Sequence, residues 1–123
     1  MKITNIKRLK SRKENSTLLS LIDTLSREKK PIWKRVVYEL SKPRKQSAEV
    51  NLSKLEVYAA DGGTVLVPGK VLGSGSISKR ITVAAFSFSD SARKLIADAG
   101  GRAVSIESLY KTNPRGKDVL ILT

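Results

Sequence analysis

The sequence predicts a small mixed α/β domain preceded by a helical and basic N-terminal part. Two stretches in the first third repeat apolar residues at helical spacing, and the second half alternates short β-branched segments with one more helical stripe. With 123 residues, 40% of them hydrophobic, the chain can bury one modest core. We therefore expect a basic arm over residues 1–14 and a single domain over 15–123, helical over 15–60 and mixed over 61–123.

The arm is strongly basic and has few apolar residues. It cannot bury enough apolar surface to order itself, so we expect it to order against a phosphate backbone. The alternative is a frayed, solvated tail. Residues 1–47 carry 14 basic and 4 acidic side chains, whereas residues 48–123 carry 10 and 7, and this asymmetry favours contact with RNA. The candidate contact residues of the arm are Lys2, Lys7, Arg8, Lys10, Arg12 and Lys13.

Two amphipathic helices are expected after the arm. Asn15 is suited to the N-cap of the first helix, whose apolar residues recur at i, i+3, i+4 and i+7. These residues are Leu18, Leu21, Ile22 and Leu25. Arg27, Lys29 and Lys30 close this helix at the negative end of its dipole. Pro31 is expected to start the second helix, which must end before Pro43.

The second helix has an apolar side and a polar side. The apolar side carries Ile32, Trp33, Val36, Val37 and Leu40. A tryptophan in a basic protein can stack on a base, but Trp33 shares its side with valines and a leucine, which favours packing in the core. Lys34 and Tyr38 lie on the other side, four residues apart and therefore neighbours.

A basic loop over residues 41–47 follows, with Lys42, Arg44 and Lys45 as candidates for binding phosphate. The alternative for these cations is a solvated surface. Asn51 can then cap a short helix that carries the apolar residues Leu52, Leu55 and Ala59.

The second half predicts four short strands and one helix. The strands are expected over Thr64–Val67 and Arg80–Phe88, around Val104 and Ile106, and over Val119–Leu122. Residues 67–75 are rich in turn formers and read as a connection. A helix should begin at Ser89 or Asp90 and end at Gly100-Gly101. Its apolar stripe is Ala92, Leu95, Ile96 and Ala99. Residues 110–117 form another basic loop.

The residue types argue against catalysis, metal binding and a cofactor. Cysteine and histidine are absent, which removes thiolate chemistry and the commonest general base and metal ligand. Gly73-Ser74-Gly75 resembles the start of a dinucleotide-binding loop, but Ser78 stands where its third glycine belongs. No Walker motif occurs, and each scattered carboxylate is explained more simply as a cap or a surface charge. We predict a protein that is not an enzyme.

The charge balance predicts a polyanionic partner. The net charge is +13 and the pI is near 10.3. No apolar run approaches the roughly 20 residues that span a bilayer, and the N-terminus has no signal-peptide pattern, so a cytoplasmic location is expected. The motifs of known single-strand RNA binders are missing, and aromatic residues are few. The sequence therefore favours recognition of RNA shape and backbone.

Three stretches closely resemble one ribosomal protein family. They are Val50-Asn51-Leu52-Ser53-Lys54-Leu55, Val67-Pro68-Gly69-Lys70-Val71-Leu72-Gly73-Ser74-Gly75, and Val83-Ala84-Ala85-Phe86-Ser87-Phe88-Ser89 with Ala92 and Ala99-Gly100-Gly101. The family is the "eighteen-e" family of the archaeal and eukaryotic large ribosomal subunit, which shares its core domain with bacterial large-subunit protein fifteen. The resemblance covers almost the whole chain. The chain ends soon after its last expected strand, so it resembles the archaeal form.

This resemblance implies a structural role on the ribosome in the cytoplasm, docked on large-subunit ribosomal RNA beside other ribosomal proteins, with no small-molecule substrate and no membrane. It also implies that the backbone at Gly69, Gly73 and Gly75 comes close to RNA, whereas the residues alone predict a tight turn at Pro68-Gly69 and positive φ at Gly73 and Gly75. Outside the arm, the candidate RNA-binding residues are Lys34, Arg35, Lys42, Arg44, Lys45, Lys70, Lys79, Arg80, Lys111, Arg115 and Lys117.

Two other functions remain open from the residues. A general DNA-coating chromatin protein has the same composition, but duplex DNA should then compete as well as ribosomal RNA at equal salt. A small enzyme acting on RNA would show an activity that depends on a divalent metal or on pH.

Overall fold

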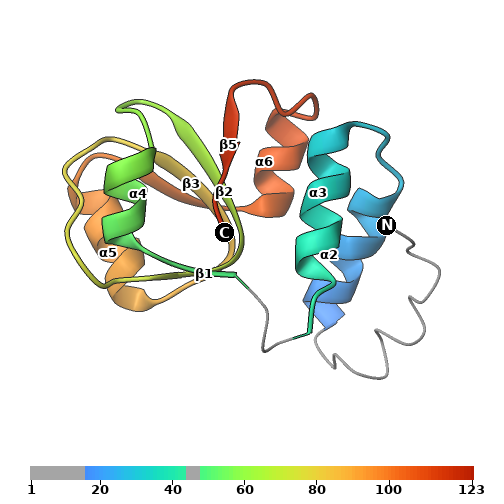
Figure 1. Ribbon diagram of the computed structural model, residues 1–123, viewed down its shortest axis with the longest axis horizontal. Coiled ribbons are helices and arrows are strands. Elements are labelled where there is room, and N and C mark those ends of the chain that lie inside the picture. The colour runs from blue at the N-terminus through green and yellow to red at the C-terminus, as the bar shows by residue number, and fades with distance from the viewer. Residues whose placement is uncertain (1–15, 44–47) are drawn as a thin grey trace. The chain divides into compact units, whose positions relative to one another are not determined.

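The chain divides into two compact units, Met1–Gln46 and Ser47–Thr123, in the computed structural model of Figure 1. The structure describes residues 16–43 and 48–123. The predicted arm, the N-cap Asn15 and the loop residues Arg44 and Lys45 lie outside the described residues. The described part contains five helices and five strands, which confirms the mixed α/β class.

The described part of the first unit consists of helices α2 (Ser16–Ser26) and α3 (Pro31–Leu40). The four apolar residues that predicted α2 are all buried, and so are the large apolar residues of α3 other than Ile32. Trp33 is fully buried, which confirms its predicted role in the core. The first helix ends at Ser26, so the three predicted closing cations follow α2 instead of lying in its last turn.

Helix α3 has the predicted bounds. Pro31 occupies its first turn, where a missing N–H leaves no hydrogen bond unmade, and Ser41 is its C-cap, two residues before Pro43. Lys34 and Tyr38 are both exposed, as the sequence predicts.

The second unit is built on a parallel five-stranded sheet. The strands β1 (Ala48–Asn51), β2 (Thr64–Leu72), β3 (Thr82–Phe88) and β4 (Arg102–Ser105) lie side by side in chain order. The fifth strand, β5 (Val119–Ile121), pairs with residues 64–66 of β2, whereas β1 pairs with residues 69–72. The two short strands therefore pair with different halves of β2.

Helices α4 (Leu52–Tyr58) and α5 (Asp90–Asp98) lie on one face of this sheet and α6 (Ile106–Thr112) lies on the other (Figure 1). Right-handed crossovers explain the placement, because the chain reverses its direction across the sheet only between β4 and β5. Neighbouring strand residues therefore point into different cores: Val65, Val83 and Ala85 belong to the larger one, while Leu66 and Ala84 are buried between them in sequence.

Three sequence predictions in this unit were wrong. The short strand β1 was not predicted. Residues 67–72 continue β2 instead of forming a connection, so Pro68-Gly69 is not a tight turn. The strand pairing shifts register between Val67 and Lys70, and such an irregularity accommodates a proline that has no N–H for the ladder. Ile106 starts helix α6 instead of lying in a strand, and α6 includes the first part of the predicted basic loop.

Helix α5 begins and ends as predicted. The hydroxyl of Ser89 accepts a hydrogen bond from the N–H of Ala92 at 3.1 Å, which caps the first turn. At the other end, Gly100 has a φ of 86°. The N–H groups of Gly100 and Gly101 donate to the carbonyls of Ala97 and Ile96, a pairing that favours glycine after the helix. Among the described helices, none is both long and apolar enough to cross a membrane.

Candidate nucleic-acid interface

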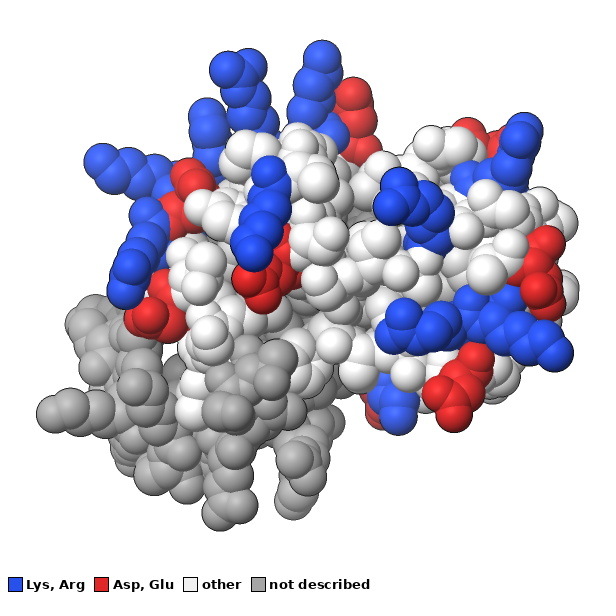
Figure 2. Space-filling view, turned by 180° about the vertical axis from the view of Figure 1, so that it is seen from behind, with Lys and Arg blue, Asp and Glu red and all other residues white. Residues whose placement is uncertain are grey.

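The exposed surface carries many cations with carboxylates between them. Figure 2 shows Lys and Arg side chains that project from the surface, with Asp and Glu side chains interspersed. The cations that can meet a phosphate are those whose charged ends the protein itself does not hold. Each predicted contact residue was therefore sorted by its partners.

Helix α3 gathers three of the predicted contact residues. Lys34 and Arg35 are exposed, and Lys42 follows the helix by two residues. The carboxylate of Glu39 lies 2.8 Å from Lys42 Nζ and 3.7 Å from Arg35 Nε. Glu39 is 4% exposed, so this carboxylate is buried beneath the two cations it pairs with. Lys34 makes no ion pair with any described residue.

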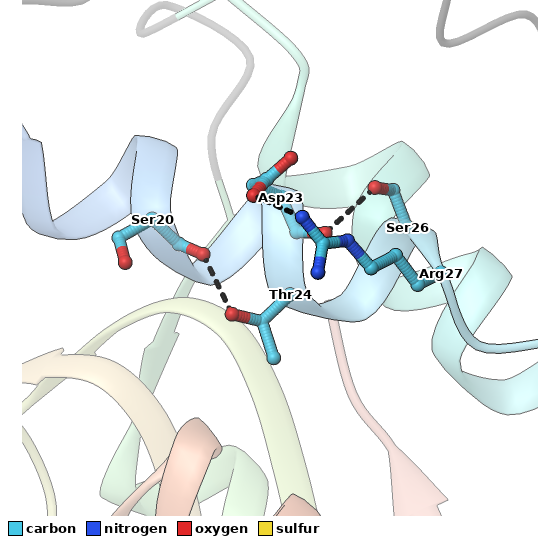
Figure 3. A network of polar contacts seen from close by, with 5 residues as sticks. All are labelled: Ser20, Asp23, Thr24, Ser26 and Arg27. Carbon is cyan, nitrogen blue, oxygen red and sulfur yellow. Dashed lines mark hydrogen bonds and ion pairs between the residues drawn. The ribbon is translucent and has the colours of Figure 1, made fainter.

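Helix α2, by contrast, satisfies its own polar side chains (Figure 3). Arg27 Nη2 lies 3.3 Å from the carboxylate of Asp23, and the hydroxyl of Ser26 donates to the Asp23 carbonyl at 2.8 Å. The hydroxyl of Thr24 donates to the carbonyl of Ser20 at 3.0 Å. The guanidinium of Arg27 is therefore less available to a phosphate than the ammonium of Lys34.

In the second unit, Lys70 and Lys79 differ sharply. Lys70 is exposed on β2 and makes no ion pair with the described residues, although its register partner on β1 is Glu49. Lys79 Nζ instead donates to the carbonyls of Glu56 and Ala59, at 2.6 and 2.8 Å. This ammonium stabilises the C-terminal end of α4, where a cation is favoured. Most of its donor capacity is therefore used inside the protein.

The connection between β2 and β3 is held against α4 at a second point. The hydroxyl and the backbone N–H of Ser78 both donate to the carboxylate of Glu56, at 2.6 and 2.7 Å. These two hydrogen bonds, with a smaller contribution from the charge of Lys79, lower the pKa of Glu56 below its ordinary value. Arg80 begins the approach to β3; its backbone N–H donates to Asp61, and its side chain is exposed.

The residues that follow α6 form an organised cationic loop. The side-chain amide of Asn113 donates to the carbonyl of Lys117 at 3.0 Å, and its oxygen accepts the Lys117 N–H at 3.3 Å. Arg115 and Lys117 are exposed on this loop and make no ion pair with the described residues. Lys111, on the last turn of α6, lies 3.1 Å from Glu107 in an exposed pair. Exposed pairs of this kind are weak and leave the lysine available.

The three predicted glycines have protein neighbours. A Cβ on Gly69 would collide with the carbonyl of Ala48 in β1, and one on Gly73 would collide with the side chain of Ser91. Gly75 has a φ of 90°, as predicted, and approaches Ser53 at the start of α4. Gly73, by contrast, does not have the predicted positive φ. These close approaches explain the glycines without RNA, and the proximity of this backbone to RNA stays a prediction.

Sequence reasoning missed Tyr38 and Glu39 as residues of the α3 surface. Tyr38 was placed beside Lys34 but was given no role, and the structure puts Lys42 Nζ 5.3 Å from the centre of its ring. The spacing of 34, 38 and 42 by four residues was the available signal. The pairing of Glu39 with two cations could have been found from its i−4 and i+3 positions.

The described residues contain no group of three or more His, Cys, Asp or Glu side chains that could hold a metal ion. A small parallel α/β unit and a helical unit instead present separate sets of exposed cations. Together with a net charge of +13, these features define a basic protein of the class that binds polyanions through surface lysines and arginines.

The comparison with protein families identifies the particular family. Residues 4–104 match the model of a ribosomal protein family that comprises 50S-L15, 50S-L18e and their counterpart in the 60S subunit. The chain belongs to this family, as its resemblance to the "eighteen-e" proteins predicts.

Curated relatives cover nearly the same length. The large ribosomal subunit protein eL18 of Archaeoglobus fulgidus is 50% identical over 115 residues, which are 90% of this chain and 98% of the relative. The protein of the same name from Methanospirillum hungatei is 46% identical over 92% of this chain and 94% of its own length. The one from Halobacterium salinarum is 45% identical over 87% and 92%.

Proposed function

We propose that the protein is a structural component of the large ribosomal subunit that binds ribosomal RNA and has no catalytic role. The observation that carries this proposal is its 50% identity with an archaeal large-subunit protein over 90% of the chain. The location that follows is the ribosome, in the cytoplasm. Its neighbours are large-subunit ribosomal RNA and other proteins of that subunit.

The exposed cations support binding through the phosphate backbone. We assign the contacts of the described part to cations whose charged ends make no ion pair there, or are paired but still partly open to solvent. They are Lys34, Arg35, Lys42, Lys70, Arg80, Lys111, Arg115 and Lys117. Lys79 is left out of this set because its ammonium holds the end of α4. The arm adds its six cations, and Arg44 and Lys45 add two more.

The binding mechanism is neutralisation of phosphates by these side chains, with release of counterions. The affinity should fall with salt, with a slope in log–log form of roughly 0.7–0.9 for each phosphate contact. If six to ten contacts form, a fourfold rise in salt should lower the affinity by about three to five powers of ten.

A competition experiment separates this function from a chromatin role. Labelled large-subunit ribosomal RNA is bound by the full chain and challenged with unlabelled ribosomal RNA or duplex DNA at equal salt. We expect ribosomal RNA to compete far better, because its folded shape presents phosphates and 2′-hydroxyls that B-form DNA lacks. Equal competition by duplex DNA would instead favour a general nucleic-acid-coating protein.

A further inference from the structure

An exposed tyrosine lies in the middle of the cationic surface of α3. Tyr38 is 45% exposed. Lys34 precedes it by one helical turn and Lys42 follows it by the same spacing, so the three side chains are neighbours on one side of the helix. Lys42 Nζ lies 5.3 Å from the centre of the Tyr38 ring. The ring therefore stands between two cations and contacts one of them.

The carboxylate of α3 does not oppose a polyanion at this surface. Glu39 is the only acidic residue in the helix, and it is 4% exposed. Its two oxygens lie 2.8 Å from Lys42 Nζ and 3.7 Å from Arg35 Nε. The buried carboxylate thus anchors both cations next to Tyr38, and the atoms that face solvent are cationic or aromatic.

We propose that Tyr38 stacks on an unpaired base of ribosomal RNA while Lys34, Arg35 and Lys42 bind the phosphates on either side of that base. This inference rests on the proposed function, because it names a recognition site within it. A flexible strand that binds by stacking needs an exposed ring for its bases and cations for its backbone, and every base offers a face to such a ring. The α3 surface supplies both.

Tyr58 on α4 provides a matched control. It is more exposed than Tyr38, at 61%, but its chemical surroundings differ. Its i−4 neighbour Lys54 donates to the carbonyl of Thr123 at 2.6 Å, so this ammonium is held by the protein. The residue before Tyr58 is the apolar Val57, which is 70% exposed. An aromatic ring without free cations beside it should contribute little to RNA binding.

The test measures the affinity of the full chain for two probes, large-subunit ribosomal RNA and a labelled oligoadenylate of about ten nucleotides, as a function of salt. Tyr38→Ala should lower the affinity about 5- to 150-fold, which is the range for losing one stacked base. Tyr38→Phe keeps the ring and should bind like the unmodified chain, and so should Tyr58→Ala. Thermal unfolding of each variant checks that the fold is retained.

The salt dependence separates stacking from charge. Tyr38→Ala should leave the slope of log affinity against log salt unchanged, because it removes no charge. Lys34→Ala should reduce that slope by about 0.7, the value for one single-strand phosphate contact. A slope that falls in Tyr38→Ala would show that the ring acts by holding a lysine, and would overturn the inference.

Three further results would overturn it. Tyr38→Ala with unchanged affinity would remove the ring from the RNA site. An equal loss in Tyr38→Phe would assign the effect to the hydroxyl. A Tyr38→Ala chain that binds RNA normally but enters the large subunit poorly would assign the ring to a protein neighbour. Failure of the unmodified chain to bind ribosomal RNA would instead refute the proposed function itself.

Discussion

At the scale of single residues, a charged side chain acts according to what the protein already gives it. The carboxylate of Glu56 accepts two hydrogen bonds from Ser78, and these favour its ionised form. Because the folded pKa lies below the ordinary value of 4.5, the ionised carboxylate stabilises the fold above the unfolded pKa. That stabilisation is lost as the pH falls through the folded pKa.

Glu56→Gln should therefore reduce stability at neutral pH and matter less in acid. We expect the difference in unfolding free energy between the two chains to shrink as the pH falls well below 4.5. Urea unfolding at a series of pH values measures it. An equal difference at every pH would show that the charge of Glu56 is irrelevant and only its shape is used.

The buried carboxylate of Glu39 predicts unequal effects of its two partners. Lys42→Ala should destabilise the protein by about 1–3 kcal/mol, because it leaves a buried acceptor with only the more distant Arg35. Arg35→Ala should cost less than about 1 kcal/mol, since its pair is longer and its side chain is more exposed. Urea unfolding compares the two variants, and a larger loss in Arg35→Ala would contradict this ranking.

The candidate site could be predicted from the sequence only in part. Composition and local charge identify which segments are basic, and the exposed positions of Lys34, Arg115 and Lys117 agree with that prediction. They do not reveal which ammonium groups are already bound. Lys79 and Lys70 look alike in the sequence, yet Lys79 is held by two carbonyls that come from residues at least twenty positions away.

At the scale of elements, periodicity found the helices with three or more buried positions and missed the shortest elements. Helices α2, α3 and α5 begin and end close to their predicted bounds. Strand β1 has one buried residue, Val50, so it gives no alternating signal. Helix α6 buries only Ile106 and Leu109, but its Ser105 cap, which accepts from the Ser108 N–H at 3.0 Å, was a usable sign.

The pairing of β1 with β2 depends on the absence of a side chain at Gly69. Gly69→Ala should destabilise the protein by about 1–3 kcal/mol, because the new methyl group collides with the carbonyl of Ala48. Hydrogen exchange should become faster in residues 48–51 in particular. Lys70→Ala, at the next and exposed position, serves as the control; an equal effect there would mean that the collision is not the cause.

The connection that Lys79 holds is a second test at this scale. Lys79→Ala should lower stability by about 1–3 kcal/mol, since two carbonyls of α4 lose their donor. It should leave the salt dependence of RNA binding unchanged, whereas Lys70→Ala should reduce the slope by about 0.7–0.9. A reduced slope in Lys79→Ala would return this lysine to the set of RNA contacts.

At the scale of the whole molecule, the charge is concentrated in the first 47 residues, which hold 14 of the 24 Lys and Arg. Removing residues 1–13 should therefore lower the affinity for ribosomal RNA and flatten its salt dependence more than Arg115→Ala with Lys117→Ala, because six cations are lost instead of two. Titrations of both variants over a range of salt measure the slopes. A slope that is unchanged by the truncation would exclude the arm from the RNA contacts.

The central claim is that this protein is a built-in part of the large ribosomal subunit. Sedimentation of the tagged chain from its own cells through sucrose gradients, at low and at high salt, tests it most directly. The account predicts that the chain sediments with the large subunit and stays there at moderate salt, because many contacts must break together. Sedimentation as a free protein, or together with DNA, would contradict the account.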